Sequence, residues 1–243
     1  WRSIFLLNLP IGVFGTIWSY LRLKEIGIKT VDQKFDYAGS VLYCIGLSII
    51  LIAMTIGDPL SKRNIAILAG GVAFFILVIF IELKQKYPML DLTLFKIRSF
   101  AAGNLAGFLN SIAWTCGPFL RSLYLQLILG YSAAKTGILL IPMEIVIFAI
   151  SPISGRLADK YGSRVLSSVG LALNSAALFW FSTLNQNSPY GAVLISLFLF
   201  GFGMALFFPP NSSAVMGSVP AEKRGVANGI RMTINQTAGV LSV

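Results

Sequence analysis

The stretch VLSSVGLALNSAALFWFSTLNQNSPYGAVLISLFLFGFGMALFFPPNSSAVMGSVPA, residues 165–221, runs for 57 residues without one charged side chain. A helix that crosses the hydrocarbon core of a bilayer needs about 20 mostly apolar residues. The run is therefore too long for one crossing, and its polar turn NQNSPYG, residues 185–191, divides it in two. This stretch predicts two consecutive membrane-spanning helices.

Further apolar stretches lie on both sides of this run. Those before it have 18 to 22 residues each, and one more begins near Gly225: the stretches are 3–21, 37–57, 64–81, 99–120 and 136–155, the last interrupted by Glu144. Barrel strands need only about 10 residues, so these lengths favour helices. With 56% hydrophobic residues and a mean hydropathy of +0.79, the chain is predicted to be an all-α polytopic membrane protein with about eight transmembrane helices.

The net charge of +10 is distributed unevenly between the connections. Fourteen of the 19 Lys and Arg residues lie in or beside the connections after the first, third, fifth and seventh spans. Basic loops stay on the cytoplasmic side of a membrane. We therefore expect a multi-pass protein of the cell membrane, with these four loops cytoplasmic and the lipid bilayer as its surroundings. The basic residues then give no reason to expect nucleic acid as a partner.

Residue types that commonly bind metals are scarce. The chain has no His, and its two Cys residues, Cys44 and Cys116, fall inside apolar spans, where a buried thiol is the expected state. There is neither a P-loop nor a GxGxxG motif. We predict no metal, no cofactor and no enzymatic activity.

Two charged residues are expected deep inside the membrane. Glu144 lies at the centre of the fifth span, and Arg121 lies in the fourth, at a similar distance from the turn near Tyr131. A carboxylate at that depth is normally paired, protonated or next to water. Glu144 is therefore either a structural hydrogen-bonding group or a proton-coupling or substrate-contacting group. We expect Arg121 and Glu144 to approach each other or to share a hydrated cavity.

Further polar residues in the spans suggest a pathway for a solute. Asn228, Arg231 and Asn235 are spaced to share one face of the eighth span, either as contacts between helices or as a wall facing substrate. Asn110 and Trp114, one turn apart in the fourth span, suit an amphipathic organic ligand, although most membrane aromatics only pack or anchor.

The connection GRLADKYGSRVL, residues 155–166, concentrates four charges between apolar spans. Gly155 is expected to end the fifth span and Gly162 to make a tight turn. Asp159 is the only acid here, and it is expected to pair locally or to cap the start of the sixth span. Lys160 and Arg164 supply basic charge beside it. The loop is either a topological turn or a conformational latch.

Several motifs together resemble the 14-helix drug:proton antiporters, multidrug exporters of the major facilitator superfamily. They are WRSIFLLNLPIG at the start, YLQLILGYSAAKTGILLIP, the loop motif SPISGRLADKYGSRVL, and RGVANGIR near the end. The resemblance covers nearly the whole chain in the family's order. The loop departs from a frequent family pattern, with Lys160 in place of Arg and Ser163 in place of a basic residue.

The resemblance implies a partial major facilitator fold and a division of the chain. Residues 1–24 would be the last helix of the amino-terminal bundle, 25–36 a cytoplasmic linker, 37–86 an inserted helix pair, 87–98 a cytoplasmic connection, and 99–243 a truncated carboxy-terminal bundle. The chain does not start with Met and ends within a predicted span, so we expect an internal piece of a longer protein whose amino-terminal bundle is a further partner.

The function implied by the resemblance is secondary active transport. Substrate would bind between two bundles and exchange for protons by alternating access, and the loop at Asp159 would latch the bundles on the cytoplasmic side. Proton-driven export of small amphipathic compounds is one interpretation. A carrier for a specific metabolite, such as a sugar, peptide, siderophore or organic anion, is the alternative.

Overall fold

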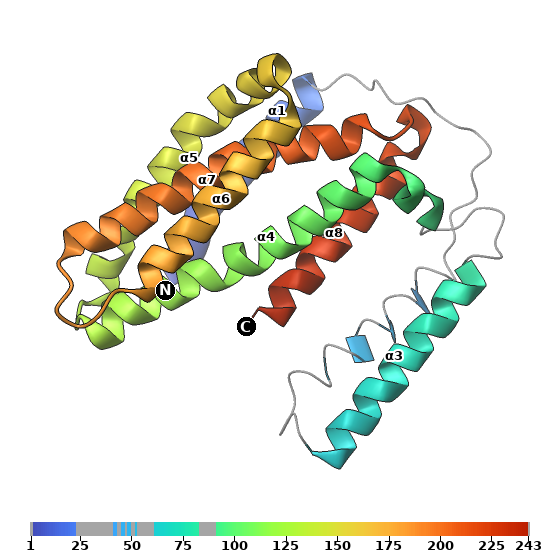
Figure 1. The fold of residues 1–243 in the computed structure, drawn as a ribbon, viewed down its shortest axis with the longest axis horizontal. Helices are drawn as coiled ribbons and strands as arrows, with labels where there is room; N and C mark the ends of the chain where they lie inside the picture. The colour runs from blue at the N-terminus through green and yellow to red at the C-terminus, as the bar shows by residue number, and fades with distance from the viewer. Residues whose placement is uncertain are drawn as a thin grey trace. The chain divides into compact units, whose positions relative to one another are not determined.

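The computed structural model describes residues 2–22, 41–42, 45–46, 48–49, 52, 61–82 and 91–242. These residues form long helices and no strand, which confirms the all-α prediction. In chain order the long helices are α1 (Arg2–Arg22), α3 (Lys62–Glu82), α4 (Arg98–Leu123), α5 (Ala133–Tyr161), α6 (Ser163–Ser182), α7 (Tyr190–Gly217) and α8 (Arg224–Leu241) (Figure 1). Short helical segments are η1 (Leu92–Lys96), the π-helical η2 (Tyr124–Ile128) and η3 (Ala221–Lys223).

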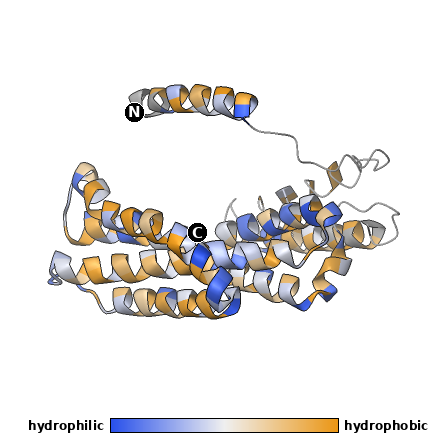
Figure 2. Cartoon of the chain, turned by 90° about the horizontal axis from the view of Figure 1, so that it is seen from above, coloured by the Kyte–Doolittle hydropathy of each residue, from blue (hydrophilic) through white to orange (hydrophobic). Residues whose placement is uncertain are grey.

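Three of these helices, α5, α6 and α7, are long and apolar enough to cross a membrane by themselves. Hydrophobic residues recur along the long helices, with hydrophilic residues between them (Figure 2). The protein is thus a multi-pass membrane protein. The number of eight spans stays a prediction, because most of the second predicted span, 37–57, and the linker 25–36 lie outside the described residues. The predicted division of the chain into domains likewise stays a prediction.

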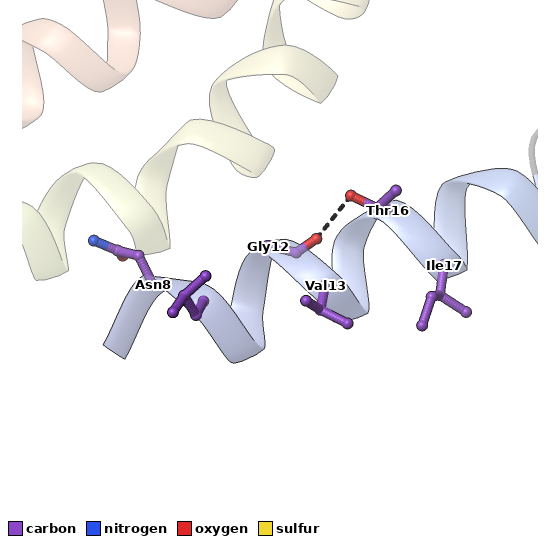
Figure 3. A pocket seen from close by; sticks show the side chains of 6 residues that line it. Asn8, Gly12, Val13, Thr16 and Ile17 are labelled. Carbon is purple, nitrogen blue, oxygen red and sulfur yellow. Dashed lines mark hydrogen bonds between the residues drawn. The ribbon is translucent and has the colours of Figure 1, made fainter. Parts of the chain in front are cut away.

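The chain divides into two units, 1–33 and 34–243. Within the first unit, α1 presents Asn8, Gly12 and Thr16 along one side, and the Thr16 hydroxyl donates a hydrogen bond to the Gly12 carbonyl at 2.9 Å (Figure 3). Its large apolar side chains are exposed, among them Val13 and Ile17. An amphipathic or apolar helix of this kind requires membrane or protein around it.

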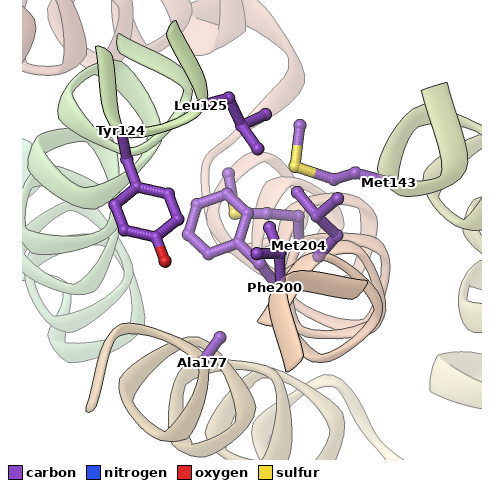
Figure 4. Packing of buried hydrophobic residues seen from close by; sticks show 8 residues of the cluster. Tyr124, Leu125, Met143, Ala177, Phe200 and Met204 are labelled. Atoms are coloured by element: carbon purple, nitrogen blue, oxygen red, sulfur yellow. The ribbon is translucent and has the colours of Figure 1, made fainter. Parts of the chain in front are cut away.

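Helix α7 lies at the centre of the second unit. It packs against α4, α5, α6 and α8, and Phe200, Met204 and Leu197 on α7 are buried with Met143 of α5 (Figure 4). Small residues bring α6 very near: a Cβ added to Gly170 would lie 2.7 Å from both the Gly203 carbonyl oxygen and the Phe207 nitrogen. Close approach through glycine is how membrane helices maximise packing where burial from water gives no driving force.

Helices α4 and α8 lie side by side and run in the same direction (Figure 1). A Cβ on Gly107 of α4 would approach Asn235 of α8, and a Cβ on Gly239 of α8 would approach Thr115 of α4. The earlier of these α4 residues thus meets the earlier α8 residue, and the later meets the later, so the two helices run parallel. Parallel packing brings the starts of both helices to the same end of the bundle.

One local prediction near this end needs correction. Gly155 does not end the fifth span, because α5 continues to Tyr161 and stops only at Gly162, whose φ of 84° favours glycine. In the short helical segment η1 before α4, Leu94 turns inward to a buried cluster with Phe100 and Val215. It does not face lipid, since packing against α7 and α8 covers it.

Candidate functional site

Arg121 is fully buried within the bundle. Its guanidinium carbon lies 4.2 Å from the centre of the Phe200 ring and 5.4 Å from that of Phe181, and its Nε donates a long hydrogen bond to Ser196 Oγ at 3.5 Å. Both terminal nitrogens lack a partner among the described residues. Cation–π contacts therefore replace an ion pair. Since α4 and its neighbours cover Arg121 completely, a solute cannot touch it in this conformation.

Glu144 lies elsewhere, on an exposed face of α5. In the part of the chain that the structure describes, the one ion pair joins Asp91 and Lys223. The prediction that Arg121 and Glu144 approach each other is thus wrong as an ion pair in this conformation. The similar depth of the two residues stays a prediction; depth does not specify the face of a helix, and Arg121 packs against α7 while Glu144 is exposed.

Asn110 belongs to a buried amide cluster. Its Oδ1 accepts a hydrogen bond from Asn174 Nδ2 of α6 at 2.7 Å, and both amide nitrogens lie 3.2–3.3 Å from the Met204 sulfur of α7. Buried amides are normally hydrogen-bonded in this way. The cluster fixes α4, α6 and α7 to one another, so Asn110 acts here as a contact between helices.

Trp114, one turn further along α4, is 40% exposed. One face of its indole stacks on Phe200 with ring centres 6.4 Å apart and the planes 5° from parallel. A residue packed on one face and open on the other retains surface for an amphipathic ligand. Of the pair predicted from the fourth span, Trp114 is accessible and Asn110 is not.

The predicted polar face of α8 is partly open. Arg231 is half-buried; its Nη1 donates to Ser212 Oγ of α7 at 2.7 Å, and its guanidinium carbon lies 5.4 Å from the centre of the Phe208 ring. Asn228 is exposed one turn before it. Asn235 points inward, and its Oδ1 is buried without a partner among the described residues. The predicted stripe is thus exposed at Asn228 and half-buried at Arg231 and Asn235.

The charged connection between α5 and α6 is compact. Gly162 serves as the end of α5 and the start of α6, and its N–H donates to the Ala158 carbonyl at 2.9 Å. Asp159 is exposed in the last turn of α5, without an ion pair among the described residues, and it does not cap α6. Both local roles predicted for Asp159 are therefore wrong. Lys160 lies 5.3 Å from the Tyr161 ring centre, and Arg164 is exposed.

The sequence reasoning missed an ion pair at this end of the bundle. Lys223 Nζ, just before α8, lies 2.6 Å from Asp91 Oδ2, just before α4, and Asp91 also accepts hydrogen bonds from the Thr93 backbone and hydroxyl. Partial burial opposes ionisation, but the bonds from Lys223 and Thr93 prevail and hold the pKa of Asp91 below its ordinary value. The sequence signal for this ion pair was Asp91, the one acid in the basic connection 87–98.

A comparison with known protein families identifies the fold. A family model described as Major Facilitator Superfamily matches residues 1–243. The chain belongs to the major facilitator superfamily. The resemblance predicted from its motifs is confirmed, and the bundle of α4 to α8 is part of a major facilitator fold.

Relatives of this major facilitator protein are named as transporters and exporters. The riboflavin transporter RibZ of Clostridioides difficile (strain 630) is 28% identical over 243 residues, covering 99% of this chain and 52% of the relative. The multidrug resistance protein Stp of Mycobacterium tuberculosis (strain ATCC 25618 / H37Rv) is 30% identical over 241 residues, covering 95% and 43%. The multidrug export protein EmrB of Escherichia coli (strain K12) is 29% identical over 245 residues, covering 98% and 48%. The chain spans about half the length of these relatives.

Proposed function

We propose that the protein carrying these residues is a secondary active transporter of the cell membrane that exports small amphipathic compounds in exchange for protons. Support comes from membership of the major facilitator superfamily and from relatives, one named as a multidrug resistance protein and one as a multidrug export protein. The observation that carries the proton-coupled part is Glu144. It lies 11 residues into α5, about 17 Å along the axis, and it is exposed. Lipid does not tolerate an exposed carboxylate at that depth, so water or protein faces it.

The open polar surface of the bundle supplies candidates for contact with substrate. Trp114, Arg231 and Asn228 are accessible, whereas Asn110, Arg121 and the Asn235 oxygen are held inside as structural groups. We assign the first three, with Glu144, to the substrate and proton pathway. The other three hold the pathway helices in place.

Asp159 supports a conformational latch at the end of α5. A carboxylate in the last turn faces the negative end of the helix dipole, which is unfavourable by about 0.3–1 kcal/mol. Because no local cation pairs with Asp159 among the described residues, a partner in the amino-terminal bundle explains the position better than local structure does.

The topology proposed from charge also gains support. The Asp91–Lys223 pair brings the connections before α4 and before α8 to the same end of the bundle, and both belong to the loops with the most cations. We place this end, with the loop at Asp159, on the cytoplasmic side. The amino-terminal bundle and a small-molecule substrate are the proposed partners; no enzymatic step is part of the proposal.

Export is tested in an efflux-deficient bacterial host that expresses the full-length protein. Ethidium accumulation is measured with and without an uncoupler. We expect lower accumulation that the uncoupler abolishes, and we expect Glu144→Gln to lose at least 90% of this effect. Glu222→Gln, which changes an exposed acid of η3, is the matched control. Drug export would be contradicted if ethidium accumulation changed neither with expression of the protein nor with the uncoupler.

A second candidate function is transport of a defined metabolite, because one relative is named as a riboflavin transporter. Membrane vesicles prepared from the same bacterial host distinguish the two functions. Gradient-dependent flux of riboflavin without flux of ethidium would favour the metabolite carrier.

The latch is tested by Asp159→Asn, which keeps the size of the side chain and removes its charge. We expect slower transport, because the charge that would pair with the amino-terminal bundle is gone. Unchanged transport would leave the loop as a topological turn.

A further inference from the structure

Two arginines lie within the spans of α4 and α8, and their surroundings differ. Arg121 is fully buried, while Arg231 is half-buried and keeps part of its guanidinium open. A guanidinium has five N–H donors, and Ser212 takes one from Nη1 of Arg231. No carboxylate lies within ion-pair distance of Arg231 in the described residues. Its positive charge is therefore not neutralised by α4, α5, α6 or α7.

The groups around Arg231 favour an organic ligand. Phe208, whose ring centre lies 5.4 Å from the guanidinium carbon, is 55% exposed, and Asn228 is exposed one helical turn away. The hydrogen bond from Arg231 Nη1 to Ser212 Oγ restrains the orientation of the guanidinium. A planar cation, an open aromatic face and an amide thus occur together on one surface.

This combination selects a chemical class. A guanidinium fork binds a carboxylate through two parallel charge-assisted hydrogen bonds. An exposed aromatic ring packs against an apolar body. A cationic ligand would gain no ion pair from Arg231, and no acid lies within ion-pair distance of that guanidinium in the part of the chain that the structure describes.

We propose that Arg231, Phe208 and Asn228 form a subsite for amphipathic organic anions, with Arg231 binding the carboxylate and Phe208 packing on the apolar body. This inference rests on the proposed transport function and names a substrate class for it. Arg231 is then a specificity-determining residue, and Ser212 positions it.

Binding to the purified full-length protein tests the subsite directly. Fluorescence polarisation of carboxyfluorescein, an aromatic carboxylate, is compared with that of ethidium, an aromatic cation of similar size. We expect Arg231→Gln to weaken carboxyfluorescein binding about tenfold or more and to change ethidium binding less than twofold. Arg231→Lys keeps the charge but loses the fork, so an intermediate loss is expected.

The matched control is Met232→Leu, because Met232 is an exposed neighbour on α8 without charge. It is expected to change neither affinity. Equal losses for both probes in Arg231→Gln, or no loss for the anion, would overturn the subsite. If Arg231→Gln does not fold, the test relies on Arg231→Lys. The subsite is overturned if the lysine variant binds carboxyfluorescein as tightly as the wild type.

Export of the same probes from proteoliposomes separates this inference from the proposed function. Arg231-dependent binding of carboxyfluorescein without export of either probe supports the subsite and contradicts export. Export of ethidium without binding of carboxyfluorescein overturns the subsite and supports export. Failure of both binding and export contradicts both.

Discussion

Polar side chains inside this bundle are positioned by the cost of leaving them unpaired. Asn174 Nδ2 donates to Asn110 Oδ1, and both amide nitrogens reach the Met204 sulfur, a weak acceptor that is nevertheless preferable to hydrocarbon, while Asn174 Oδ1 has no partner among the described residues. Arg121 uses the faces of two phenylalanines instead. Such groups determine which helices meet, because a buried polar group without a partner costs about 1–3 kcal/mol.

Gly170 is the residue at which size matters most between α6 and α7. An added methyl would meet backbone atoms 2.7 Å away, and backbone does not move aside cheaply. We expect Gly170→Ala to destabilise the protein by about 1–3 kcal/mol, measured by thermal unfolding in detergent. Gly137→Ala in α5, where nothing lies within 4 Å, is the control and should be neutral or slightly stabilising. Equal effects would contradict the close contact.

Asp91 gives the fold a small dependence on pH. Its pKa is lowered in the folded protein, so its contribution to stability is present above the ordinary value of 3.8 and is lost as pH falls through the lowered value. Lys223 is 49% exposed, so solvent screens the pair and the expected coupling is about 0.2–1 kcal/mol.

The measurement is a double-mutant cycle of Asp91→Asn and Lys223→Gln, followed by thermal unfolding at pH 7 and below pH 3. Coupling at pH 7 that vanishes at the lower pH is expected. Glu222→Gln, in the neighbouring position, is the control. Coupling that persists once Asp91 is protonated would show that packing, not charge, joins the two connections.

At the scale of the helices, the sequence predicts where elements lie but not how they face. Charges bound the apolar runs, and α3, α6 and α7 match those runs to within a few residues, whereas α5 continues beyond its run to Tyr161. Which side of α4 packs against α7 depends on residues far along the chain. The burial of Arg121 and Asn110 therefore could not be predicted from the sequence. The same limit applies to Gly155, since a glycine ends a helix only where packing lets the chain turn.

The two glycines of the loop motif should therefore respond differently to the same change. Gly162 has φ 84° and ψ 140°, a conformation that alanine avoids, so Gly162→Ala is expected to cost about 1–3 kcal/mol. Gly155 is inside α5 with nothing within 4 Å, so Gly155→Ala should stabilise by about 0.4–1 kcal/mol. Thermal unfolding of both variants measures this. A costly Gly155→Ala would show that another part of the protein packs there.

At the scale of the whole molecule, the exposed faces of the helices differ in chemistry. The outer face of α6 carries large apolar side chains such as Val169 and Phe179, as expected next to lipid. The exposed residues of α8 include Gly225, Asn228, Gly229 and Gln236, with Met232 and Leu241 as the large apolar side chains among them. A helix face of this kind next to lipid would leave amide groups without hydrogen bonds. Helix α8 therefore faces a water-filled pathway or a protein partner, whereas α6 faces the bilayer.

This asymmetry predicts a labelling pattern in the full-length protein with its own cysteines replaced. Asn228→Cys and Gln236→Cys are expected to react with a water-soluble maleimide at least tenfold faster than Phe179→Cys, because the thiolate forms readily only in contact with water. Transported substrate should slow the reaction at Asn228→Cys if the pathway passes there. Equal, slow labelling at all three positions would place α8 against lipid or a tightly packed helix, and the assignment of Arg231 and Asn228 to the pathway would then fail.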